Sequence, residues 1–150
     1  MIKKIKPFIF SLFVLVVLTA CNGSSKETTA VCTLENNTNE TNITETITYK
    51  DDKIIKMVEV NKGKAVNVDD KTKKQLDDEI AKFNNTAGIK ASYELKDDNL
   101  TTTIEVDYTK ADLKKLSELG IIETKADEKA TSISFSETKA GFEKQGFTCK

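Results

Sequence analysis

The amino-acid sequence predicts an α+β domain with one antiparallel sheet of about five strands, two hairpins plus flanking strands, and two to three helices on one face. Two observations predict this class. Residues 46–60 and 92–106 align on a shared Lys-Asp-Asp triplet, and each segment has two runs of alternating apolar residues separated by a tight turn. An amphipathic stretch follows each hairpin, and amphipathic helices bury their apolar faces against a sheet.

The amino-terminal segment has the pattern of a bacterial export signal. Three lysines in the first six residues precede an apolar run at residues 8–18, which is too short for the ~20 residues that a transmembrane helix needs. Leu-Thr-Ala-Cys at 18–21 matches the lipobox of bacterial lipoprotein precursors. We therefore interpret residues 1–20 as a lipoprotein signal peptide.

The lipobox resemblance implies that Cys21 carries the membrane anchor. Its thiol would receive a diacylglyceryl group, the chain would be cut before it, and the new amino group would be acylated. Two or three acyl chains anchor a protein stably, at about 0.8 kcal/mol for each buried CH₂ group. We expect a protein anchored in the cell membrane on its extracytoplasmic side, with the small polar residues 21–29 as a flexible tether.

One domain is expected over residues 30–150. A first strand is predicted at 31–35, and the first hairpin follows, with apolar residues alternating at Ile43, Ile47 and Tyr49. Glu45 falls in the apolar phase of this strand, so we expect it at an edge or an end of the sheet. A helix capped by Asp69 or Asp70 comes next, and it is expected to end at Gly88. The apolar stripe of this helix comprises Leu76, Ile80, Phe83 and Ala87.

The second half repeats this order. After the hairpin, Thr109 with Asp112 predicts the start of a leucine-striped helix that ends at Gly120. A short strand at 131–135 and a helix at 136–145 follow, and residues 147–149 are expected to return to the sheet.

Cys32 and Cys149 are the two cysteines left after Cys21. An even pair in an exported protein, one at each end of the domain, predicts a disulfide. Closing so long a loop stabilises a fold by about 4 to 5 kcal/mol in the chain-entropy description. The alternative is a pair of free thiols in a poorly oxidising compartment.

Composition excludes most familiar active sites. The 150 residues contain no His, and every one of the 23 basic residues is Lys. The chain therefore lacks the usual general base and zinc nitrogen ligand, and it lacks the guanidinium that clamps phosphates. The mature chain has a net charge of −4, which gives no footprint for nucleic acid. We predict no enzyme activity, no catalytic residue, no metal ligand and no cofactor.

Paired aspartates are the most conspicuous acidic feature. They occur at 51–52, 69–70, 77–78 and 97–98, and none has the loop spacing of a calcium site. Two pairs fall at predicted hairpin turns and one at a helix start, where Asp has local backbone roles. We interpret these pairs as turn and cap residues.

The whole pattern resembles the YehR-like family of small bacterial lipoproteins. The resemblance rests on the lipobox, the early cysteine, the two hairpins with their helices, the block VDYTKADLKKL at 106–116 and the motif T-x-x-x-F-E-x-Q-G-F at 138–147. It covers nearly the whole mature chain and is most specific at 107–116. It implies an α+β fold. The family has no known function, so it supplies no catalytic or binding residues.

The function expected from these features is non-enzymatic binding at the cell envelope. The candidate binding face is the polar side of the second hairpin, with an envelope protein or polymer as its partner. This face comprises Thr101, Thr103, Glu105 and Asp107. Two alternatives stay open. One is a carrier with a pocket for a small ligand or ion between sheet and helices; the other is a carboxylate hydrolase, although the chain has no Trp to hold a sugar.

Overall fold

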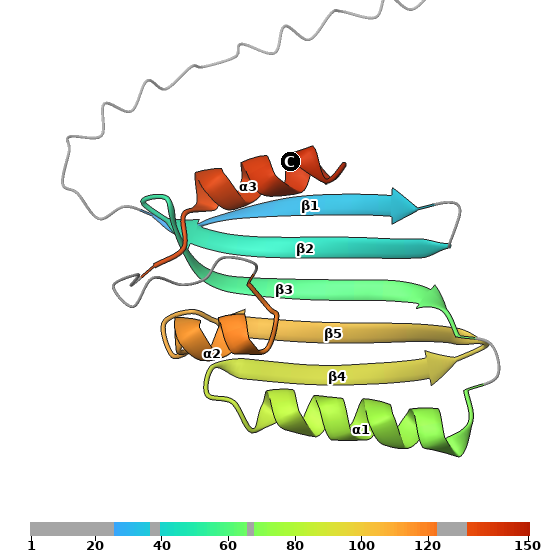
Figure 1. The fold of residues 1–150 in the computed structure, drawn as a ribbon. Coiled ribbons are helices and arrows are strands. Elements are labelled where there is room, and N and C mark those ends of the chain that lie inside the picture. Colours follow the sequence, from blue (N-terminus) through green and yellow to red (C-terminus); the bar gives the residue numbers. More distant parts are fainter. Residues whose placement is uncertain (1–25, 37–39, 66–67, 123–131) are drawn as a thin grey trace, which may run out of the picture.

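The computed structural model describes residues 26–36, 40–65, 68–122 and 132–150, and within these ranges the chain forms one antiparallel sheet of six strands and three helices (Figure 1). The strand order is β4-β5-β3-β2-β1-β6. The predicted α+β class is therefore confirmed. The predicted signal peptide and Cys21 lie outside the described residues.

The elements follow the predicted order with shifted bounds. They are β1 (Thr28–Asn36), β2 (Thr41–Lys50), β3 (Lys53–Lys64), α1 (Asp70–Asn84), β4 (Ile89–Lys96), β5 (Asn99–Asp107), α2 (Leu113–Glu118), α3 (Phe135–Lys144) and β6 (Thr148–Cys149). β1 begins two residues before the expected domain boundary. The strand predicted at 131–135 is wrong in its described part, because Ser134 makes one isolated bridge to Lys53 and then caps α3. Residue 131 lies outside the described ranges.

Both hairpins turn on an aspartate pair. Asp51 and Asp52 have φ of 49° and 62°, and Asp97 and Asp98 have φ of 51° and 58°. Two consecutive left-handed residues form the type I′ turn, whose twist matches that of the flanking strands. Asp tolerates this conformation better than most residues. The interpretation of these pairs as turn residues is confirmed.

The helices begin at aspartate or serine caps. The Asp69 side chain accepts a hydrogen bond from the backbone N–H of Thr72 at 2.8 Å, which confirms the predicted cap of α1. Asp112 caps α2 by accepting from the N–H groups of Lys114 and Lys115. The predicted start at Thr109 is wrong, since Thr109 N–H and hydroxyl donate to the Asp107 carboxylate instead.

The end of α1 also differs from the prediction. The helix stops at Asn84, so Ala87 lies outside it and is exposed. The Asn84 side chain accepts from the N–H of Ala91 at 2.8 Å and donates to its carbonyl at 2.9 Å. It thus satisfies the outer backbone groups of the edge strand β4 at this position. Asn84, the last residue of α1, therefore ties the end of the helix to the sheet edge.

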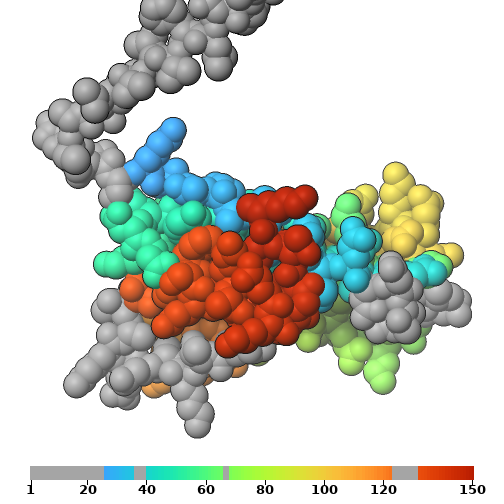
Figure 2. All heavy atoms as spheres, turned by 90° about the horizontal axis from the view of Figure 1, so that it is seen from above, coloured from blue at the N-terminus to red at the C-terminus, as the bar shows by residue number. Residues whose placement is uncertain are grey.

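All three helices lie on the same face of the sheet. α3 packs beside β1 and β2, whereas α1 runs along β4 and α2 lies near β5 (Figure 1). Figure 2 shows α3, in red, against one side of the strands β1 and β2. The buried residues form two clusters, one under α3 and one under α1 and α2. The first comprises Cys32, Ile47, Ile54 and Phe147, and the second comprises Ile89, Val106 and Leu116.

The predicted disulfide joins the two ends of the domain. Cys32 in β1 and Cys149 in β6 are directly opposite each other in the sheet, and their sulfur atoms are bonded. The bond closes a loop of 117 residues. Cys32 is fully buried in the cluster under α3, so the disulfide is part of the core.

Candidate functional site

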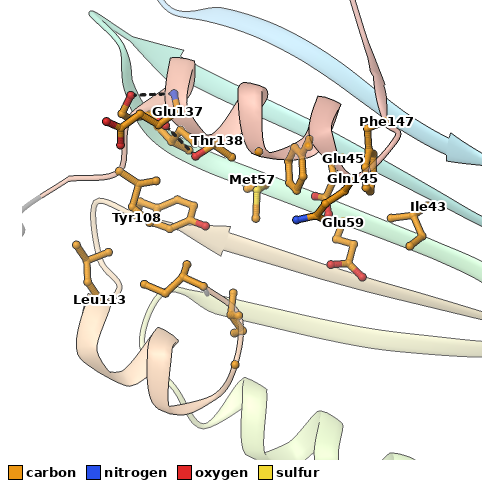
Figure 3. Close-up of a pocket in the computed structure, with 18 of the residues that line it drawn as sticks. Ile43, Glu45, Met57, Glu59, Tyr108, Leu113, Glu137, Thr138, Gln145 and Phe147 are labelled. Carbon is orange, nitrogen blue, oxygen red and sulfur yellow. Dashed lines mark hydrogen bonds between the residues drawn. The ribbon is translucent and has the colours of Figure 1, made fainter. Parts of the chain in front are cut away.

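A cavity of about 540 Å³ lies over β2 and β3, between α3 and the segment that follows α2 (Figure 3). On this face of the sheet, α3 covers the strands at one edge, and α1 and α2 cover those at the other. The space over the middle strands is less filled by side chains. Tyr108, which directly follows β5, packs against both core clusters and borders the cavity. The cavity is therefore lined by residues that pack against both core clusters.

The sequence of α3 explains why this space is not filled. The helix and its C-cap Gln145 present one stripe to the cavity, formed with Glu137, Thr138, Gly141 and Phe142. Phe142 is the one large apolar side chain among these five. A Cβ atom built on Gly141 would have no other atom within 4 Å. Gly141 and Thr138 are smaller than leucine, so this stripe leaves open a space that a leucine stripe would fill.

The walls of the cavity are mainly apolar. Leu34 and Ile43 contribute from β1 and β2, Met57 contributes from β3, and Ile121 and Ile122 contribute from the segment after α2. A register shift between β2 and β3 at Thr48 and Tyr49 places Ile54 and Met57 on the same face although they are three residues apart.

Two carboxyl groups face the cavity from adjacent strands. Glu45 in β2 is directly opposite Cys32 on one side and Glu59 of β3 on the other, and Glu59 is opposite Ile104 of β5. Residues opposite each other in an antiparallel pair share a face. The carboxyl pair therefore belongs to the helix-covered face, next to the disulfide, and Figure 3 shows both side chains there with Gln145 extending toward them from α3.

The expectation that Glu45 occupies an edge or an end is wrong. β2 is an interior strand, and Glu45 is 4 % exposed. Strand alternation holds through this position, so Glu45 points inward like Ile43 and Ile47. The cavity gives its carboxyl group room that a filled core would not.

The environment of Glu45 favours its protonated form. Burial, the negative charge of Glu59 and a hydrogen bond with the Glu59 carboxyl together raise the pKa of Glu45 to about 8. No N–H or O–H group among the described residues donates a hydrogen bond to its Oε2 atom. Burial, aided by the charge of Glu45, raises the pKa of the Tyr108 phenol, so this hydroxyl stays neutral. At neutral pH the pair holds one proton.

The candidate binding face of the second hairpin lies on the opposite side of the sheet. Thr101, Thr103, Glu105 and Asp107 alternate with Ile104 and Val106, which point toward the helices. Glu105 pairs with Lys56 at 2.9 Å, and Lys90 is 4.0 Å away. Hydrogen bonds from Lys110 and Thr109 lower the pKa of Asp107 to about 2. The carboxylates of this face are thus already matched by lysines of the same chain.

Sequence analysis predicted the disulfide and offered a pocket between sheet and helices as an alternative, but it assigned none of the residues that line the cavity to that pocket. Glu45 could have been recognised as a cavity residue, because it is an acid in the apolar phase of a strand. No such sequence signal marked the other cavity residues, namely Glu59, Tyr108, Gly141 and Gln145. Three or more His, Cys, Asp or Glu side chains nowhere converge as metal ligands in the described part of the chain. Among the helices of residues 26–36, 40–65, 68–122 and 132–150, none is long and apolar enough to span a bilayer.

Comparison with known proteins identifies relatives of this chain. Residues 30–148 match the family described as "Protein of unknown function (DUF1307)". The uncharacterized lipoprotein Lin0239 of Listeria innocua is 35% identical over 98% of this chain and 95% of its own. The uncharacterized lipoprotein Lmo0207 of Listeria monocytogenes is 31% identical over the same shares.

Two solved structures share the fold. The YehR protein of E. coli, solved by NMR, has a TM-score of 0.66 and 22% identity, covering 85% of this chain and 93% of that one. A protein from Streptococcus pneumoniae TIGR4, also solved by NMR, has a TM-score of 0.63 and 21% identity. The match covers 100% of this chain and 99% of that one. The predicted resemblance to YehR-like proteins is confirmed.

Proposed function

The chain belongs to the DUF1307 family of proteins of unknown function, and from this premise we propose that it is a lipid-anchored, non-enzymatic binding protein of the cell envelope whose cavity over β2 and β3 takes a small ligand. The lipoprotein character of both Listeria relatives supports the anchor. The cavity supports binding of a small molecule, rather than binding of a macromolecule through the open face of the sheet.

The anchor is tested at Cys21. We expect Cys21→Ala to abolish incorporation of labelled palmitate and to shift the protein from the membrane fraction to the soluble fraction, because the thiol that accepts the lipid is gone. Cys32→Ala is the matched control, since it removes a cysteine of the disulfide and should leave labelling intact. Continued labelling and membrane retention of Cys21→Ala would contradict the anchor.

The dimensions and lining of the cavity support a ligand site. Small-molecule sites are mostly concave, between about 300 and 1,000 Å³, with apolar walls and a few polar groups that fix orientation. The cavity has about 540 Å³, apolar walls and one buried carboxyl pair. On the open face, by contrast, Glu105 and Asp107 are already paired with lysines.

The cavity is tested by filling it from α3. Gly141→Phe places a ring in the open space beside this glycine, whereas Ala140→Phe places the same ring on an exposed position of the helix. We expect the neutral fluorophore N-phenyl-1-naphthylamine to brighten with the soluble chain beginning at Asn22 and with Ala140→Phe. It should not brighten with Gly141→Phe. Equal fluorescence with all three proteins would contradict binding in the cavity.

The same carboxyl pair argues against the hydrolase alternative. Glycosidases hold their two carboxyl groups about 5 Å or more apart, so that the reacting bond fits between them. Glu45 and Glu59 are directly opposite each other on adjacent strands and interact directly, so they do not stand apart on the two sides of a cleft. This contact supports a role for the pair in binding.

A further inference from the structure

Building on the proposed function, we propose that the ligand of the cavity is a small organic cation, with its ammonium group held by Glu45 and Glu59 and its apolar part lying beside α3. The cavity, the buried carboxyl pair and the charges around them carry this inference.

Negative charge in the cavity is not balanced by the residues that line it. The described lining contains Glu45, Glu59 and Glu137, and it contains no lysine, although the chain has 23. The open face of the same sheet differs, because Lys56 pairs with Glu105 there. A cation from outside the chain would supply the balancing charge that the lining lacks.

One oxygen of Glu45, Oε2, has no hydrogen-bond partner among the described residues. The residue as a whole is 4 % exposed. A buried acceptor without a donor costs about 1 to 3 kcal/mol, and more when it is charged. An ammonium group has three N–H donors, and the carboxyl oxygens of Glu45 and Glu59, directly opposite each other on adjacent strands, face the cavity as acceptors for them.

The lining fits an organic cation better than a metal ion. Calcium binds six to eight oxygen atoms, whereas two carboxyl groups and one phenol offer fewer. Most of the remaining wall is apolar and would face the hydrocarbon part of a ligand. The Phe142 and Phe147 rings, whose centroids are 4.9 Å apart, both border the cavity, and aromatic faces attract cations.

Binding would exchange one cation for another. The pair holds a single proton at neutral pH, since burial and the charge of Glu59 raise the pKa of Glu45. When the ammonium group enters, this proton leaves to the solvent, and the net charge of the site is unchanged. Among the described residues, the groups around Glu45 are Glu59 from β3, Tyr108 after β5, Gln145 at the end of α3 and the uncharged disulfide of β1 and β6, and none of these is positive.

The experiment compares two probes of nearly equal shape. Benzylamine, which is cationic at pH 7, and neutral benzyl alcohol are titrated by calorimetry into the full-length protein in phosphatidylcholine nanodiscs, with empty nanodiscs as the blank. Two buffers of different ionisation enthalpy report proton release. We expect benzylamine to bind at least about tenfold tighter than the alcohol and to release about one proton.

Three variants locate the effect. Glu45→Gln and Glu59→Gln should each weaken benzylamine at least about tenfold, with the alcohol changed by less than about twofold, and Glu45→Gln should also abolish proton release. Glu105→Gln makes the same substitution on the open face and should change neither probe. Circular dichroism checks that each variant is folded. If one of the two carboxyl variants misfolds, the other still tests the inference.

The outcomes separate the two proposals. Equal affinity for amine and alcohol, or benzylamine binding unchanged by both carboxyl variants, overturns the cation inference and leaves the cavity as a small-ligand site. Binding of neither probe, or binding that Gly141→Phe does not affect, contradicts the proposed function as well.

Discussion

The substitution Glu45→Gln should make this protein more stable at neutral pH. In the folded chain, burial and the charge of Glu59 raise the pKa of Glu45 from 4.5 to about 8. Between these two pH values the unfolded chain has released the proton while the folded chain still binds it. The free energy of unfolding therefore falls as pH rises through this window, and it is unaffected below it. Gln cannot ionise, so the variant does not have this dependence.

The size of the effect follows from the same shift. One pKa unit corresponds to about 1.4 kcal/mol, so Glu45 lowers the free energy of unfolding by about 3 kcal/mol at pH 7 and by about 5 kcal/mol above pH 8. Domains of this size are stable by about 5 to 15 kcal/mol, so the effect is a substantial fraction. At pH 7 the variant should melt roughly 10 °C higher than the wild type.

Urea unfolding followed by far-UV circular dichroism measures this difference. The soluble chain beginning at Asn22 is compared with its Glu45→Gln variant at pH 4, 5.5, 7 and 8.5. We expect equal stability at pH 4 and a gap that widens with pH. Glu105→Gln is the control. Glu105 is partly exposed, and its hydrogen bond with Lys56 lowers its pKa, so this carboxyl group does not destabilise the fold as pH rises from 4.5 to 8. The measured quantity is the free energy of unfolding of Glu45→Gln minus that of the wild type. If this difference is no larger at pH 7 than at pH 4, the reasoning is refuted.

Two further predictions concern the ends of the domain. Replacing Cys32 and Cys149 together by Ala, or reducing the disulfide, should lower the free energy of unfolding by about 4 to 5 kcal/mol in urea titrations, and an unchanged midpoint after reduction would contradict this. Asp52→Asn should lower the melting temperature at pH 7, because the Asp52 carboxylate accepts hydrogen bonds from the Ser134 hydroxyl and the Ser136 N–H at the start of α3. These bonds lower the pKa of Asp52, so the difference from the wild type should shrink as pH falls below 3.8, and a constant difference down to pH 3 would argue against the contact.

Local signals in the sequence predicted most of the fold. The aspartate pairs at 51–52 and 97–98 predicted the two hairpin turns, and the structure gives both a left-handed backbone. Asp69 predicted the start of α1, and the two domain cysteines predicted the disulfide. Each of these features depends on residues close in sequence or on a simple count, so no knowledge of packing was needed.

The cavity could not be predicted in this way because it depends on what is missing from a distant element. Glu45 was visible as an acid in an apolar phase, but its partner Glu59 lies on the next strand and became adjacent only through the β2–β3 register. Whether this face is filled depends on Gly141 and Thr138 of α3, about 95 residues later. The alternation of apolar residues along a strand shows which face of the sheet is covered. It does not show how large the helix side chains that pack against that face will be.

The disulfide also determines how the domain resists mechanical pulling. β1 is the first element after the segment that leads to Cys21, and only Thr28, Thr29, Ala30 and Val31 of this strand precede Cys32. Tension applied from the amino-terminal side can therefore detach four residues before it meets the covalent ring closed by Cys149. Beyond that point the load passes through the sulfur bridge, and the sheet between the two cysteines cannot be drawn out as a straight chain. Such a domain would keep the cavity over β2 and β3 intact while the segment before β1 is stretched.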